Sequence, residues 1–174
     1  PKVDIDSKRK GGILFKIERY RAKVIPDLSP EDPNFSVSAI TDKEAYRIGD
    51  EVKLIMEASM DAHLTVFSIA PDGSAALYLP NRFQKDAFVF GNDVSYFPDQ
   101  YTQKIFTMRA KKTEGFRLPT DELFLVVATK SNYIFDDRRK SFVYYTDMLA
   151  INRWLMKIPR NERAEAFATF RVRE

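Results

Sequence analysis

The sequence offers few side chains from which a catalytic site could be assembled. It contains one histidine, His63, and no cysteine among its 174 residues. Thiol catalysis, a histidine pair and a zinc site built on cysteine are therefore excluded. We expect no Ser–His–Asp constellation around the lone histidine, which stands beside the start of a predicted strand. We expect a protein that is not an enzyme and that has no catalytic residues and no cofactor.

Carboxylates are plentiful, but their spacing does not predict an acid–base pair or a metal site. The pairs Asp121-Glu122 and Asp136-Asp137 are sequence neighbours. Their side chains would point apart on extended backbone, unlike the facing carboxylates of a glycosidase. Asn92, Asp93 and Asp99 could supply hard oxygen ligands for calcium, although they lack the regular spacing of an EF-hand loop. We expect no metal.

Residues 82–103 form the least regular part of the chain, and they are rich in large aromatic side chains. These are Phe83, Phe88, Phe90, Tyr96, Phe97 and Tyr101. One hypothesis is that the segment folds over an edge or end of a β-structure and that its rings enter the core. The other is an exposed patch that binds a protein strand, a peptide or a glycan. The six aromatic residues are the candidate binding residues.

Positive charge is concentrated near the N-terminus. Residues 1–25 contain eight Lys or Arg and three acidic residues, whereas the rest of the chain contains 20 basic and 22 acidic residues. A basic segment could contact nucleic acid or anionic lipid. A solvated terminus explains it more simply, and the run at 136–140 is zwitterionic, so we expect no nucleic-acid partner.

No apolar run approaches the roughly 20 residues that cross a bilayer, so we expect no membrane span. The sequence starts with Pro1 rather than Met. A removed signal peptide and a lipid anchor upstream therefore both stay open.

The elements that would position these residues are mostly short strands. Apolar and polar residues alternate, or apolar residues run together, at 35–40, 52–58, 64–69, 75–79 and 104–108. We expect 52–58 and 64–69 to pair across a turn at 60–62. The nearly all-apolar run 123–128 predicts a central strand that is covered on both faces.

Turn residues separate these strands. The structural turn positions are Tyr46, Gly49, Asp50, Asp72, Gly73, Pro80 and Asn81. Gly49 and Gly73 supply turn conformations that other residues resist. We expect Tyr46 to pack in the core with its hydroxyl on a backbone carbonyl, and Asp50 to accept backbone N–H groups.

The pattern changes after residue 140. Apolar residues recur at spacings of three and four between 146 and 158, which predicts a helix capped by Thr146 or Asp147 and ended by Pro159. The alternating run 166–172 predicts a closing strand.

The whole chain, 1–174, is therefore predicted to be one domain. It would consist of a flexible lead at 1–11, a β-sandwich at 13–140, and a helix plus closing strand at 146–174. The predicted fold is an all-β, immunoglobulin-like antiparallel β-sandwich with one C-terminal helix packed against an edge or end.

The order of these motifs from Phe35 to about residue 130 resembles a bacterial family known only as domain of unknown function 4384. The positions that carry the resemblance are Tyr46, Gly49-Asp50, Asp72-Gly73, Leu79-Pro80-Asn81, Gly91, Phe97-Pro98 and the apolar run 123–128. The resemblance implies a β-sandwich-like module of envelope or secreted bacterial proteins, sometimes attached to signalling or protease domains. It implies no particular activity and no catalytic residues.

We therefore expect a non-enzymatic protein-interaction module of the bacterial cell envelope, located in the periplasm or associated with the envelope. It would bind another envelope protein through the aromatic-rich segment or a sheet edge. A module that binds a small ligand or a glycan on stacked aromatic rings is the alternative.

Overall fold

The fold is described from a computed structural model over residues 30–85, 87–135 and 143–174. The predicted flexible lead, the basic segment 1–25 and the run 136–140 lie outside the described residues. Within the described ranges the protein is mostly β-structure, with one α-helix.

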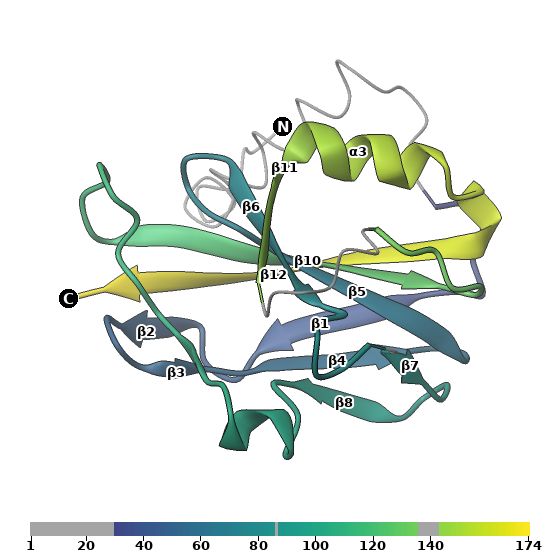
Figure 1. Ribbon diagram of the computed structural model, residues 1–174, viewed down its shortest axis with the longest axis horizontal. Coiled ribbons are helices and arrows are strands. Elements are labelled where there is room, and N and C mark those ends of the chain that lie inside the picture. The colour runs from purple at the N-terminus through teal and green to yellow at the C-terminus, as the bar shows by residue number, and fades with distance from the viewer. Residues whose placement is uncertain (1–29, 86, 136–142) are drawn as a thin grey trace, which may run out of the picture.

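The described part of the chain contains twelve strands, one α-helix and two short 3-10 helices, joined by turns and loops (Figure 1). The strands are β1 (Val37–Thr41), β2 (Ala45–Arg47), β3 (Glu51–Val52), β4 (Leu54–Ala58), β5 (Ala62–Ile69), β6 (Ser74–Leu79), β7 (Phe88–Val89), β8 (Val94–Phe97), β9 (Met108–Arg109), β10 (Thr120–Thr129), β11 (Tyr144–Asp147) and β12 (Arg163–Arg173). The helices are η1 (Thr102–Lys104), α3 (Met148–Met156) and η2 (Arg160–Glu162).

The strands form a small sheet, a large sheet and a two-stranded ribbon. The small sheet has the order β1-β4-β8, and the large sheet has the order β11-β6-β5-β10-β12-β2, with β7 joined to β5. The ribbon pairs β3 with β9. All pairs are antiparallel except β12 with β2, which is parallel. The predicted antiparallel arrangement is therefore observed in every pair of the described strands except this one.

The small and large sheets pack face to face around the larger hydrophobic cluster, which gives a sandwich-like arrangement. Strand β4 alternates as expected for a sheet with one buried face, because Leu54, Met56 and Ala58 are buried. Opposite them, β10 contributes Phe124 and Val126 from the large sheet.

The other face of the large sheet is covered by α3, which lies above it in Figure 1. Ile151, Trp154 and Leu155 of the helix join a second cluster with Phe67 and Leu125. Asp147 caps the helix, as predicted, by accepting a hydrogen bond of 2.8 Å from the Ala150 backbone N–H. The helix packs against a sheet face rather than the expected edge or end.

Because α3 and the small sheet cover opposite faces of the large sheet, β10 is buried on both sides. It pairs with β5 along one edge and with β12 along the other. The predictions of a central strand at 123–128 and of a closing strand near the C-terminus are therefore confirmed.

The expected hairpin between residues 52–58 and 64–69 does not form. Strand β4 pairs with β1 and β8 in the small sheet, whereas β5 belongs to the large sheet. The connection at Ser59–Asp61 instead carries the chain from one sheet to the other. Local alternation predicts strands, but it does not say which neighbour each one pairs with.

Residues 104–108 also differ from the predicted strand. The Asp99 carboxylate accepts backbone N–H groups from Tyr101 and Thr102, at 3.1 and 2.6 Å. These bonds nucleate the helical turn η1 in place of a strand. Only two residues, Met108 and Arg109, then pair as β9.

The predicted turn geometry is largely confirmed. Gly49 and Gly73 have positive φ angles of 89° and 85°, and the Asp50 carboxylate accepts a backbone N–H three residues earlier at 3.0 Å. Tyr46 is buried, but its hydroxyl donates to the Asp42 carboxylate at 2.5 Å rather than to a backbone carbonyl. Burial and this bond raise the pKa of Tyr46 to about 12.

Candidate ligand-binding groove

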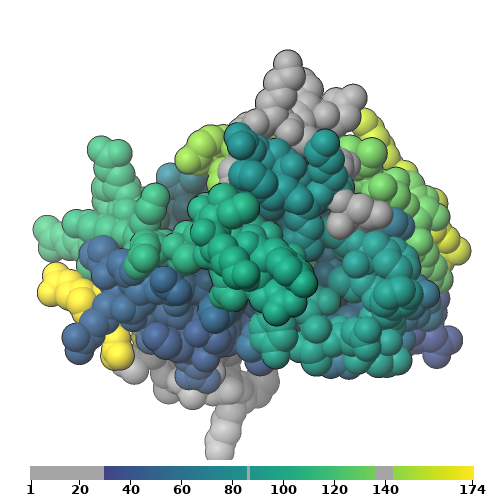
Figure 2. Space-filling model, turned by 60° about the horizontal axis from the view of Figure 1, so that its bottom comes forward, coloured from purple at the N-terminus to yellow at the C-terminus, as the bar shows by residue number. Residues whose placement is uncertain are grey.

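The two packed sheets are joined differently along their two sides. On one side β1 lies against β12, which brings the sheets together. The small sheet ends on its other side in β8, and a groove of about 550 Å³ lies between β8 and β7 of the large sheet. Figure 2 shows this face of the molecule, with the teal and green segment that follows β6 across its centre.

The floor of the groove consists of core residues. Met56 of the small sheet, Leu64 and Leu79 of the large sheet, and Ala87 all line it, and all four are buried. A ligand in the groove would therefore contact the apolar interior of the sandwich-like fold directly. A volume of this size lies within the usual range for small-molecule and peptide sites.

The wall next to the small sheet runs along the edge of β8 that has no paired strand among the described residues. Val94 and Tyr96 point to one face of the strand and Ser95 to the other, because neighbouring strand residues alternate. All three line the groove. The lining therefore includes the edge of β8 itself, as well as both of its faces.

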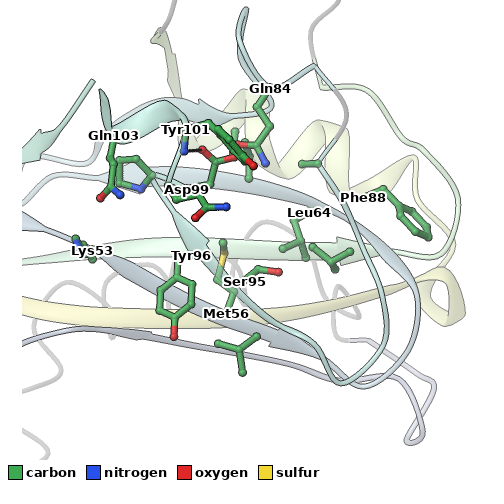
Figure 3. Close-up of a pocket in the computed structure, with 16 residues that line it drawn as sticks. Lys53, Met56, Leu64, Gln84, Phe88, Ser95, Tyr96, Asp99, Tyr101 and Gln103 are labelled. Atoms are coloured by element: carbon green, nitrogen blue, oxygen red, sulfur yellow. Dashed lines mark hydrogen bonds between the residues drawn. The ribbon is translucent and has the colours of Figure 1, made fainter. Parts of the chain in front are cut away.

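Polar side chains surround the opening. Figure 3 shows Gln84, Asp99 and Tyr101 close together on one side, with Lys53 and Gln103 farther along. Asp99 is occupied by the two backbone N–H groups that start η1. Within the described part of the chain, the side-chain oxygen of Gln84 is buried and has no hydrogen-bond partner.

One buried side chain, Asn81, fixes the start of the loop that carries Gln84. Its carboxamide oxygen accepts backbone N–H groups from Phe83 and Gln84, each at 2.9 Å. Its amide nitrogen donates to the Tyr78 carbonyl at 3.0 Å. The predicted structural role of Asn81 is thereby confirmed, and its three hydrogen bonds hold the start of the groove wall.

Farther along the chain, the turn at Gly91 is fixed by a close approach between two backbone segments. A side chain at Gly91 would place its Cβ atom 2.6 Å from the Met60 Cα, too close for any residue but glycine. The Gly91 N–H also donates to the Asp61 carboxylate at 2.8 Å. The turn between β7 and β8 is therefore held against the connection between β4 and β5.

The six predicted aromatic residues lie in four different surroundings. Phe88, Tyr96 and Tyr101 line the groove and are 42%, 53% and 70% exposed. Phe90 packs edge-on against Phe88 at a centroid distance of 5.3 Å and is itself exposed. Part of the segment is therefore exposed, as the second hypothesis requires, while its binding role stays a prediction.

The remaining two aromatic residues do not line the groove. Phe97 is fully buried in the larger cluster, where it packs near Tyr78, so its prediction as a binding residue is wrong. The reason is strand alternation, which points Phe97 inward when Tyr96 points outward. Phe83 is exposed, and the Arg82 guanidinium lies over its ring at 4.5 Å.

Sequence reasoning missed Lys53, Gln84 and Met56 as groove residues. Met56 and Lys53 come from the β4 region, which is distant in sequence from the aromatic segment, so only the pairing of β4 with β8 brings them together. Gln84 lies within the segment itself and could have been considered with its aromatic neighbours.

The carboxylates weighed for catalysis have separate surroundings. Asp121 pairs with Arg171 at 2.8 Å, whereas Glu122 faces the interior and accepts a hydrogen bond from the Thr113 hydroxyl at 3.4 Å. Burial raises the pKa of Glu122 to about 7. In the described part of the chain, no three His, Cys, Asp or Glu side chains gather as metal ligands.

No helix among the described residues is long and apolar enough to cross a membrane.

Comparison with protein-family models gives a match. The model of a family described as a domain of unknown function (DUF4384) matches residues 45–132, from β2 through β10. Neither the curated proteins nor the solved structures include a match to the chain. The matched half contains β7, β8 and the whole segment between β6 and β9 that shapes the groove. The chain belongs to the family of this domain of unknown function.

Proposed function

We propose that the protein is a non-enzymatic interaction module that binds a segment of another protein in the groove between β7 and β8. The observation that carries the proposal is the exposure of Phe88, Tyr96 and Tyr101 around a groove whose floor is the hydrophobic core. An apolar floor, aromatic walls and a few convergent polar groups are typical of binding sites. Aromatic residues are also the usual anchors of protein interfaces.

The proposal includes a place and a fold class. The family resemblance favours the bacterial cell envelope, with the protein in the periplasm or associated with the envelope, and another envelope protein as partner. Two β-sheets packed face to face, mostly antiparallel, support the immunoglobulin-like class of sandwich.

A glycan or other small ligand is the second candidate. It is favoured by the polar groups beside the aromatic rings, because Gln84, Gln100 and Gln103 could hydrogen-bond sugar hydroxyls while Tyr101 stacks on a sugar face. The two candidates share the groove and differ in what occupies it.

Site-specific photo-crosslinking in the native cell tests the proposal. A benzoyl-phenylalanine side chain replaces Tyr101, at the groove, or Tyr145 on β11, which is 82% exposed and does not line the groove. We expect a discrete protein adduct from position 101 and none of the same mass from position 145. Adducts of the same mass at both positions, or at neither, would contradict the proposal.

A further inference from the structure

The edge of β8 that faces the groove has no strand beside it within the described residues. Strand β8 pairs with β4 through residues 94–97 and ends the small sheet. Proteins usually protect such an edge with charged side chains or proline, since its unpaired N–H and C=O groups attract other strands. The four residues of β8 are Val, Ser, Tyr and Phe, without a charge. Only Pro98, which follows the strand, lacks an N–H group.

The opposite wall of the groove is also a short strand. Strand β7 pairs with β5 at Ala62 and His63, and both of its residues, Phe88 and Val89, line the groove. The groove is thus bounded by two strands that belong to different sheets. A chain lying between them in extended form would close this side of the sandwich-like fold.

Gln84 indicates what kind of group the occupant carries near the opening of the groove. Its side-chain oxygen is buried and has no donor among the described residues, and Figure 3 shows the side chain beside Tyr101 and Asp99 on one side of the opening. An unpaired buried acceptor costs on the order of 1–3 kcal/mol. A backbone N–H of a bound peptide is a donor of the right kind to remove this cost once the Gln84 carboxamide turns into the groove.

The charge of Lys53 indicates which charge one end of the occupant carries. Lys53 lines the groove and precedes Leu54, whose partner in β8 is Phe97, so it lies beside the C-terminal end of β8. Asp99 also lines the groove, but its carboxylate already accepts two backbone N–H groups. A carboxylate on the ligand would complement the positive charge of the Lys53 ammonium group.

From these four observations we propose that the groove binds an extended peptide that adds to the free edge of β8 as a fourth strand of the small sheet. Alternate side chains of this peptide enter the apolar floor at Met56 and Leu64, and an acidic residue lies near Lys53. The inference rests on the proposed function and specifies its ligand. Strand addition of this kind obtains affinity from backbone hydrogen bonds and specificity from alternate side-chain pockets.

The test uses a random decapeptide library displayed on phage, panned against the full chain. Clones that also bind the Tyr96→Ala/Tyr101→Ala variant are removed. We expect the retained peptides to alternate apolar and polar residues and to carry Asp or Glu toward one end. Lys53→Glu should then weaken their binding at least tenfold, while Lys112→Glu, outside the groove, should change it less than twofold.

Backbone methylation of the best peptide separates strand addition from other modes of binding. N-methylation at alternate positions should reduce affinity tenfold or more for the amides that face β8 and less than twofold for the others. This measurement leaves the protein unaltered, so it does not depend on how any variant folds.

The outcomes distinguish the inference from the function on which it rests. Equal tolerance of all N-methyl positions, or a library with no groove-dependent peptide, would overturn strand addition. A photo-adduct at position 101 would in that case still support the proposed interaction module. Loss of that adduct would instead remove the proposed function itself.

Discussion

Replacing Glu122 by Gln should stabilise the protein near neutral pH and leave its stability unchanged in mild acid. Burial raises the pKa of the Glu122 carboxyl from its ordinary 4.5 to about 7 in the folded protein. Between those two values the folded chain binds a proton that the unfolded chain has released. The free energy of unfolding therefore falls as pH rises through this window, and it is constant above it.

The size of the effect follows from the shift. About 2.5 pKa units correspond to roughly 3 kcal/mol at 1.36 kcal/mol per unit. Glu122 is only partly buried, so solvent screening reduces this value, and we expect about 1–2 kcal/mol. Gln keeps an oxygen that can accept the hydrogen bond from Thr113, and it carries no charge at any pH.

The assay is urea unfolding of both proteins at several pH values from 4.5 to 8. The difference in unfolding free energy should be small at pH 4.5 and rise to about 1–2 kcal/mol in favour of the variant at pH 8. Glu57→Gln, at an exposed position on β4, controls for the change in net charge. Parallel pH profiles for the wild type and Glu122→Gln, or a variant that is less stable at pH 8, would refute the reasoning.

Three further changes, the first with a matched control, test the contacts that support the groove and the core by urea unfolding. Gly91→Ala should cost about 1–3 kcal/mol, because the new Cβ meets backbone, whereas Asn92→Gly should cost nothing, since φ is already 65° there; equal losses would contradict this. Asp42→Ala should cost about 1–3 kcal/mol by removing the acceptor of the buried Tyr46 hydroxyl, and a change below 0.5 kcal/mol would show that water replaces it. Asp147→Ala should cost about 1 kcal/mol through loss of the α3 cap, and circular dichroism should show less helix.

Local patterns predict much of this fold. The turn at Asp72-Gly73, the apolar run in β10 and the helix cap at Asp147 each depend on a few adjacent residues, and each appears where the sequence places it. The pairing of β4 with β1 and β8 could not be predicted in the same way. It depends on contacts between distant segments, for which alternation carries no information about partners.

The residues of the candidate site also differ in whether the sequence could predict them. Aromatic composition identifies the segment that contributes Phe88, Tyr96 and Tyr101 to the groove. Aromatic composition cannot distinguish Phe97 from these three residues, because Phe97 turns into the core only through the alternation of side chains along β8. Lys53 joins the groove only through the packing of another strand, so no pattern within the aromatic segment could indicate it.

The place of β12 in the large sheet has a consequence for folding. This strand lies between β10 and β2, and its end pairs with residues 45–47, more than a hundred positions earlier in the chain. During synthesis, the edge of β10 that pairs with β12 stays unpaired until residues 163–173 have left the ribosome. Such non-local pairing slows folding and exposes intermediates to aggregation. The family segment at 45–132 therefore depends on later residues to complete its sheet, and truncation before β12 should yield an aggregating chain.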